Sequence, residues 1–273
     1  MRNPLISVVV ACIGAILLSG CNQVNQVLEG LNLPGSGGAD RSTAPSREDR
    51  SVSAVGRARA LLSDSPTFAQ ARDSGTVRIE SGNTVFIAGF RPIAGGSQNP
   101  IIARYDNGSL TWSRVDYETG RADGRAYGLI YDPSRNLLYA AFMVDRGQSE
   151  SVGFERFTRS GWLTGYGPGD RAKASVIAQI DPASGAATRG TFITSELTNG
   201  RTTAVVVTEL SFPDGNSIEI KANAQRHPRK ADRSRYSCSS TSQYRRRSGA
   251  FNYTLVLDNS LASAISASAP GCE

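Results

Sequence analysis

The sequence has few of the residues that bind metal ions. Its 273 residues include one histidine, His227, and four cysteines, and no Cys-x-x-Cys spacing occurs. A structural zinc site uses four closely spaced Cys or His ligands, so this sequence does not favour one. We therefore expect neither a metal nor a cofactor.

Patterns typical of catalytic sites are also scarce. No Ser/His/Asp set stands out by spacing, and His227 lies beside Pro228 in a basic segment, a poor place for an oriented base. No carboxylate pair stands out, and the aspartates are concentrated in turns, where they usually accept bonds from local backbone amides. The Gly-rich residues 160–171 lack the Gly-Lys-Ser ending of a phosphate loop. No catalytic residue is predicted.

Long hydrophobic runs are missing as well. The apolar stretch from Leu5 to Leu18, broken only by Ser7 and Gly14, is too short for a mature transmembrane helix. A positive residue, Arg2, precedes the stretch, as in an export signal.

The four residues that end this stretch are Leu18-Ser19-Gly20-Cys21. They resemble the lipobox of bacterial lipoproteins, in which small residues leave room for a peptidase just before a cysteine. The resemblance implies cleavage after Gly20, diacylation of Cys21 on sulfur and usually acylation of the new amino terminus. The alternative is an ordinary secretory signal with a chance cysteine.

The lipobox resemblance also predicts a location. Two or three acyl chains anchor a protein stably, whereas one chain does not. Asn22 stands where an Asp usually retains Gram-negative lipoproteins at the inner membrane, so the resemblance favours the outer membrane. In a Gram-positive cell the same signal implies the outer face of the plasma membrane. We expect a lipid-anchored protein facing the periplasm or the exterior, with the membrane as a partner through Cys21.

Composition divides the chain into three parts. Residues 1–20 read as the signal peptide, 21–45 as a lipid-anchored flexible tether rich in Gly, Ser and Pro, and 46–273 as a β-rich domain. A flexible coil of ~30 residues has a mean reach of roughly 30 Å, so the domain can stand clear of the headgroups.

Two cysteines, Cys238 and Cys272, remain in the mature chain besides Cys21. Export places both in an oxidising compartment, where such a pair is expected to form a disulfide. The bridge would close a loop of ~35 residues and add roughly 3–4 kcal/mol on the loop-entropy model. Two unpaired thiols are the alternative.

Three segments, 77–115, 127–194 and 205–258, share a layout of β-branched and aromatic runs separated by turn residues such as Asn107-Gly108. The strand-ending residues Asp106, Asp181 and Asp258 recur in this layout. Repetition of one supersecondary unit is typical of repeat architectures. We expect an all-β fold of repeated four-stranded antiparallel units.

Residues 87–90 and 103–113 resemble bacterial β-propeller repeats of secreted and lipid-anchored proteins. The resemblance implies propeller-like blades. Three units are fewer than the roughly four to eight blades that close a ring. An incomplete blade stack or a β-sandwich therefore stays open as an alternative.

A short helix is expected before the repeats. Ser46 and Asp49 have the spacing of a capping box, and Val52, Val55, Leu61 and Leu62 lie roughly on one helical stripe that ends near residues 64–66. We expect this helix to pack on the β domain; binding a partner is the alternative.

The net charge of +6 arises from one segment, because residues 221–247 carry nine cations against Asp232 and the rest of the chain is close to neutral. Such a loop is suited to acidic polymers or anionic lipid headgroups, and less to nucleic acid, for which no specific site is predicted. A solvated insertion is the alternative. The candidate polyanion-binding residues are Arg226, Arg229, Lys230, Arg233, Arg235, Arg245, Arg246 and Arg247.

Trp162 and Tyr166 lie on the Gly-rich segment 160–171, where their rings are candidates for stacking on a ligand such as a sugar. The alternative is that both rings cover an end of the β core. Taken together, the sequence predicts a lipid-anchored cell-envelope protein with a β-repeat domain that binds or scaffolds. An envelope polysaccharide hydrolase or lyase is the alternative function.

Overall fold

The computed structural model describes residues 51–93, 96–118, 123–145, 153–168, 173–239 and 250–273. The predicted signal peptide and tether, with Cys21, therefore lie outside the described residues. Within the described part, the chain forms open antiparallel sheets and two short helices. The predicted all-β class is confirmed.

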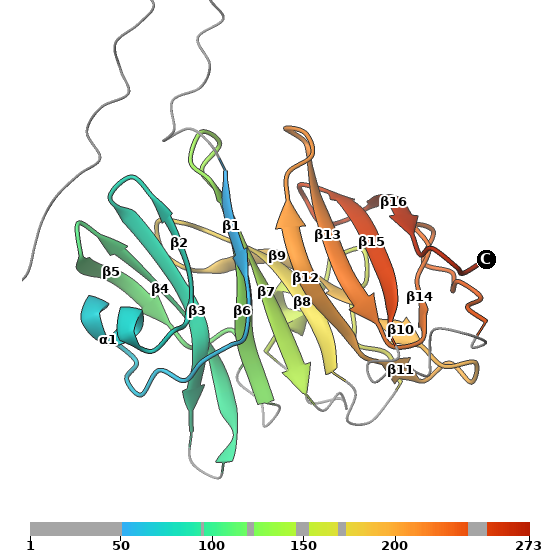
Figure 1. The fold of residues 1–273 in the computed structure, drawn as a ribbon, viewed down its shortest axis with the longest axis horizontal. Helices are drawn as coiled ribbons and strands as arrows, with labels where there is room; N and C mark the ends of the chain where they lie inside the picture. The colour runs from blue at the N-terminus through green and yellow to red at the C-terminus, as the bar shows by residue number, and fades with distance from the viewer. Residues whose placement is uncertain (1–50, 94–95, 119–122, 146–152, 169–172, 240–249) are drawn as a thin grey trace, which may run out of the picture. The chain divides into compact units, whose positions relative to one another are not determined.

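The first sheet coincides with the first predicted repeat and is a four-stranded meander (Figure 1). The β4–β5 turn contains Asn107 and Gly108 with φ of 52° and 77°, backbone angles that Asn and Gly adopt readily. The hairpin predicted at Asn107-Gly108 is therefore present. The strands are β2 (Val77–Ser81), β3 (Thr84–Pro92), β4 (Gln98–Asp106) and β5 (Ser109–Arg114).

The central sheet coincides with the second repeat and has five strands. Its meander gains an extra strand, β1 (Val52–Val55), which pairs antiparallel with β6 at one edge. The meander strands are β6 (Asp123–Asp132), β7 (Leu137–Asp145), β8 (Lys173–Ile180) and β9 (Ala187–Ile193). A short helix, α2 (Glu155–Thr158), lies between β7 and β8 in the chain.

The third sheet is again a four-stranded meander, and its last strand lies beyond the predicted third repeat. Its strands are β12 (Val205–Ser211), β13 (Ser217–Ala224), β15 (Phe251–Asp258) and β16 (Ala264–Ser268). A small sheet joins β10 (Ser195–Glu196), β11 (Thr202–Thr203) and β14 (His227–Pro228).

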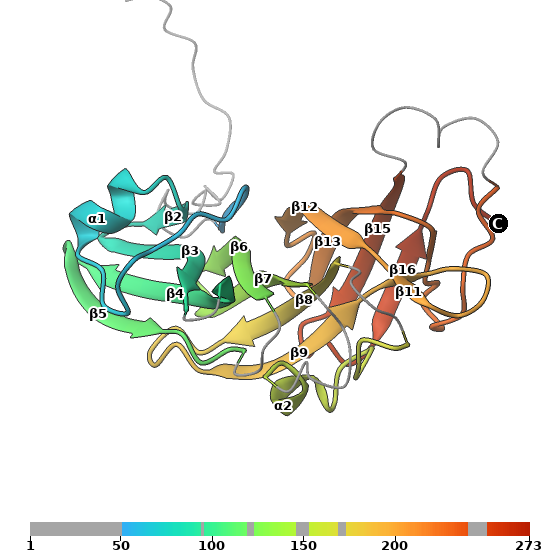
Figure 2. The same ribbon diagram turned by 90° about the horizontal axis from the view of Figure 1, so that it is seen from below.

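The three main sheets are stacked with the central sheet in the middle, as Figures 1 and 2 both show. One core lies between the first and central sheets, where Phe86 and Ile102 pack with Phe142. A second core lies on the other face of the central sheet, where Ile177 packs with Ile220 of the third sheet. The described sheets do not close into a ring, so the fold is a sandwich-like stack of open meanders.

The helix predicted over residues 46–64 is wrong in its described part. Val52 to Val55 form β1, and Gly56 continues this pairing through its N–H, which donates to Tyr127 O at 2.9 Å. Alternate β1 side chains contact different cores, Val52 the first and Val55 the second. Residues 52–55 form a strand because the edge of β6 supplies hydrogen-bond partners for their backbone. In addition, both faces of β1 contact apolar surface.

A helix does form later, at α1 (Phe68–Asp73). Thr67 and Gln70 make a capping box in which each side chain accepts a hydrogen bond from the other residue's backbone N–H. α1 buries Ala71 against the outer face of the first sheet, in a cluster with Ile87 and Tyr105.

Candidate functional site

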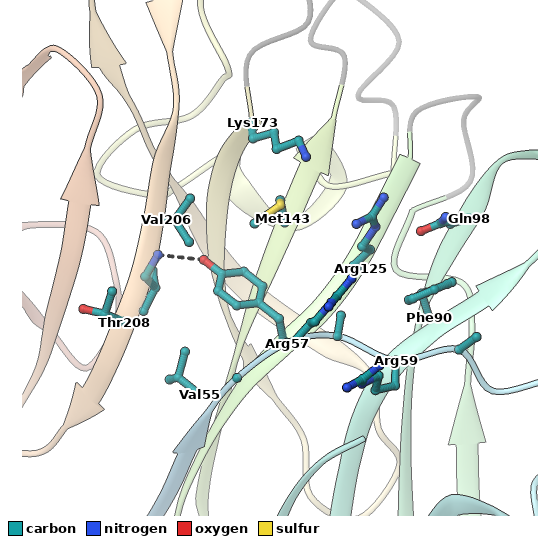
Figure 3. Close-up of a pocket in the computed structure, with 15 residues that line it drawn as sticks. Val55, Arg57, Arg59, Phe90, Gln98, Arg125, Met143, Lys173, Val206 and Thr208 are labelled. Atoms are coloured by element: carbon teal, nitrogen blue, oxygen red, sulfur yellow. Dashed lines mark hydrogen bonds between the residues drawn. The ribbon is translucent and has the colours of Figure 1, made fainter. Parts of the chain in front are cut away.

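A pocket of about 850 Å³ lies beside the central sheet, and residues of all three main sheets line it (Figure 3). The central sheet contributes Arg125, Met143 and Lys173, the first sheet contributes Phe90 and Gln98, and the third contributes residues 206–208. The segment 56–60, which follows β1, completes the lining. We call this the cationic pocket, because Arg57, Arg59, Arg125 and Lys173 all line it.

A β-bulge in β6 directs side chains toward this pocket. The register between β6 and β7 shifts between Ala126 and Gly128, which leaves Tyr127 as the extra residue of β6. Bulges of this kind re-aim side chains relative to a regular ladder. Tyr127 consequently belongs to the core shared with the third sheet, whereas Leu129, which a regular strand would place on the same face, belongs to the core on the opposite side.

Tyr127 connects the central and third sheets through a buried chain of hydrogen bonds. Val207 N donates to the Tyr127 hydroxyl at 2.8 Å, the contact drawn as a dashed line in Figure 3. The Ser175 hydroxyl donates its single proton to Val205 O at 2.7 Å, so at the 2.7 Å contact between the two hydroxyls Tyr127 is the donor. Two backbone groups at the open edge of β12 are thereby satisfied.

The same tyrosine is held in its neutral form. Burial raises the pKa of Tyr127 to about 12, although the hydrogen bonds with Ser175 and Val207 act in the opposite direction. Tyr127 therefore forms part of the structural wall of the pocket at neutral pH.

The segment 56–60 crosses from the central sheet to the first sheet. Phe90 N donates to Arg59 O at 3.0 Å, and Leu61 N donates to Phe90 O at 2.8 Å. The approach is close because Gly89 has no side chain; a Cβ there would lie 2.5 Å from Arg59 O. This crossing places the exposed side chains of Arg57 and Arg59 at the pocket.

The cations differ in their surroundings. Arg125 is half-buried, and its guanidinium carbon lies 5.5 Å from the centroid of the Phe90 ring, in a cation–π contact. Lys173 is exposed and lies two residues before Ser175 on β8, so both side chains point to the same face of the sheet. In Figure 3 Met143 lies between Lys173 and Arg125. The described lining thus contains four cationic side chains and no carboxylate.

The predicted basic loop is partly engaged within the fold. Arg229 pairs with Glu196, and its Nη1 donates to Arg233 O at 2.8 Å. Arg235 donates to Leu197 O at 3.0 Å. The Lys230 ammonium lies 5.3 Å from the centroid of the Tyr236 ring.

The other predicted polyanion-binding residues are placed as follows. Arg226 is half-buried and Arg233 is exposed. Arg245, Arg246 and Arg247 lie outside the described residues. None of the described residues of the loop lines the cationic pocket.

Trp162 and Tyr166 are both buried, with 2% and 4% of their surfaces exposed. Trp162 belongs to the core between the central and third sheets, and its indole N–H donates to Ala231 O at 2.9 Å. Tyr166 belongs to the core on the other side. Neither ring offers an open face to a ligand in this structure, so the stacking role stays a prediction that requires the segment to open.

Cys238 and Cys272, the pair predicted from the sequence, form a disulfide with an S–S distance of 2.03 Å. Cys238 N donates to His227 Nδ1 at 3.0 Å. Burial lowers the pKa of His227, and the nearby Arg235 and Arg226 lower it further. The histidine thus acts as a neutral acceptor that helps to hold the bridged end of the chain.

The strand-ending aspartates serve as turn residues. Asp181 accepts from Ala183 N at 3.0 Å, and Asp258 accepts from Ala262 N at 3.0 Å. Asp106 instead accepts from the hydroxyls of Thr84 and Thr111. Across the described ranges, no group of three or more His, Cys, Asp or Glu side chains is arranged to hold a metal ion.

Sequence reasoning missed the cationic pocket. Its four cations come from three separate stretches of chain, and none of them lies in a motif. One signal was available: Arg125 stands two residues before Tyr127, the first residue of the second repeat, so in an extended strand it shares a face with a tyrosine of the core. A cation at such a position is a candidate for a binding site.

The described residues include no helix long and apolar enough to cross a membrane. No protein-family model, curated protein or solved structure matches this chain.

Proposed function

We propose that this protein is a lipid-anchored cell-envelope protein whose β domain binds an anionic ligand. The anchoring part of the proposal rests on Leu18-Ser19-Gly20-Cys21, the lipobox-like end of the apolar stretch. Acyl chains on Cys21 would attach the protein to the outer membrane or the plasma membrane. The domain would then face the periplasm or the exterior.

The binding part rests on one observation, the four cations that line a single pocket of about 850 Å³. Pockets of roughly 300–1,000 Å³ are the size that small-molecule ligands occupy. Guanidinium groups present paired N–H donors that match the oxygens of a carboxylate or phosphate. Arg125 is also positioned in advance by Phe90, so less conformational freedom is lost when an anion binds.

The test is a titration of the mature protein, held in nanodiscs of phosphatidylcholine, with inorganic phosphate at low salt. We expect a raised midpoint of thermal unfolding, since a ligand that binds only the folded state stabilises it. The double variant Arg59→Gln/Arg125→Gln should lose this shift. Arg72→Gln/Arg78→Gln removes the same charge from α1 and β2 and should keep it. An equal response of wild type and the pocket variant to phosphate would contradict the proposal.

A further inference from the structure

We infer that the ligand of the cationic pocket is a phosphate-headed amphiphile, a molecule with a phosphomonoester at one end and a hydrocarbon chain at the other. This inference rests on the proposed anion-binding function and specifies the class of ligand.

The apolar part of the lining carries the first step. Val55, Phe90, Met143 and Val206 line the pocket and are only half-buried. They therefore leave hydrocarbon surface in contact with solvent at the same place where the cations gather. A small hydrophilic anion would leave this surface wet, whereas a hydrocarbon chain would cover it and gain the free energy of apolar burial.

The second step concerns the walls behind these side chains. Val55, Met143 and Val206 pack against the buried core between the central and third sheets, so they rest on a rigid support. Met143 is an unbranched, polarizable side chain that adapts to the shape of a flexible ligand. A preformed apolar wall of this kind fits an alkyl chain.

The third step concerns the head group. The guanidinium groups of Arg57, Arg59 and Arg125 line the pocket, and the described lining contains no carboxylate. Phosphomonoesters carry about −1.5 to −2 charges at pH 7 and three acceptor oxygens, whereas a carboxylate carries one charge and two oxygens. The phosphomonoester therefore matches this set of donors better.

A chain-length series tests the inference. The mature protein in phosphatidylcholine nanodiscs is titrated with inorganic phosphate and with ethyl, butyl, hexyl and octyl phosphate. We expect the affinity to rise roughly three- to fourfold for each added methylene until the apolar wall is covered. Alkyl carboxylates of the same lengths should bind more weakly. Affinity that does not change with chain length would overturn the inference.

A matched pair of variants tests where the alkyl chain of the ligand binds. Met143→Gln keeps the length of the side chain but makes it polar, so it should flatten the dependence of affinity on alkyl-chain length. Leu110→Gln makes a comparable change at a partly exposed residue of β5 and should leave the series unchanged. A flattened series in the Leu110 variant alone would also overturn the inference.

Two further arms separate this inference from the proposed function and identify the source of the ligand. Phosphate binding without chain-length dependence leaves the proposed function standing and rejects the inference, whereas absence of any phosphate binding rejects the proposed function.

Phosphatidic acid in phosphatidylcholine vesicles presents the same head group from a bilayer. Competition between these vesicles and octyl phosphate assigns a membrane lipid, and binding of octyl phosphate alone assigns a free amphiphile.

Discussion

The hydroxyl of Tyr127 donates to Ser175 Oγ at 2.7 Å and accepts from the backbone of β12, so one side chain joins the central and third sheets beside the cationic pocket. Ser175 and Val205 are completely buried, and Val207 is 2% exposed. Loss of the hydroxyl would leave a buried donor and a buried acceptor without partners.

Tyr127→Phe should therefore lower the free energy of unfolding by about 1–3 kcal/mol, the range for buried polar groups that lose their partner. Urea denaturation of the two proteins measures the difference. Tyr105→Phe is the control, because the Tyr105 hydroxyl makes a single bond, to Pro66 O. A larger loss in the control than in Tyr127→Phe would contradict the role assigned to the hydrogen-bond chain.

Alkaline pH should destabilise the protein in a manner that depends on Tyr127. Burial raises the pKa of this tyrosine from 10.0 to about 12. Between these values the unfolded chain releases a proton that the folded protein keeps, so the free energy of unfolding falls as the pH rises. The full contribution is present below pH 10. Urea midpoints measured from pH 9 to pH 12 should fall less steeply in Tyr127→Phe than in wild type, and equal slopes would refute this.

Gly89→Ala should destabilise the protein and weaken phosphate binding together. The new Cβ would lie 2.5 Å from Arg59 O, so the segment that carries Arg57 and Arg59 has to move. We expect a loss of about 1–3 kcal/mol, as for other overpacked sites. Gly165→Ala is the control, since no atom lies within 4 Å of a Cβ built there. Thermal unfolding with and without phosphate reports both effects.

Cys21→Ser should abolish lipidation and leave an unprocessed precursor. The cysteine sulfur is the acyl acceptor in the lipobox resemblance, and the lipoprotein peptidase acts on the acylated form. Metabolic labelling with a palmitate analogue, followed by gel analysis of precursor and mature forms, provides the measurement. Label retained in the variant would show that Cys21 is not the anchor.

Replacement of Arg245, Arg246 and Arg247 with Gln should weaken binding of residues 44–273 to anionic liposomes or an acidic glycan. This part of the chain forms one compact unit. Each Lys or Arg near an acidic membrane contributes roughly 1 kcal/mol. The loss should be largest at low salt, because exposed charges are screened within about 8–10 Å at physiological ionic strength. Arg72→Gln/Arg78→Gln/Arg91→Gln is the charge-matched control. Equal retention of both variants would identify a solvated insertion.

The sequence predicted the first two meanders and three strands of the third, because the signals for these strands are local. A pair such as Asn107-Gly108 marks a turn by its own backbone preferences, and the runs on either side show strand residues. The strand at Val52 to Val55 could not be predicted in the same way. It forms because the edge of β6 lies beside it, and β6 lies far away in the sequence.

The cationic pocket could not be predicted from the sequence for a related reason. The position of Tyr127 depends on a bulge between Ala126 and Gly128, and no single residue in the sequence predicts this bulge. The position of Arg59 depends on the absence of a side chain at Gly89, thirty residues later in the chain. Both positions result from tertiary packing, so the hydrophobic periodicity of a single segment does not predict them.

The two faces of the central sheet have a consequence for modularity. Phe142 and Ile177 on neighbouring strands face opposite cores, so β7 and β8 must be apolar on both sides. The third sheet, by contrast, alternates buried residues with half-buried or exposed ones along β13 and β15. The units therefore share the order in which their strands are connected, but they do not share the pattern of buried positions. A copy of the second unit placed in the third position would expose an apolar face, so the units cannot be exchanged or duplicated as equivalent modules.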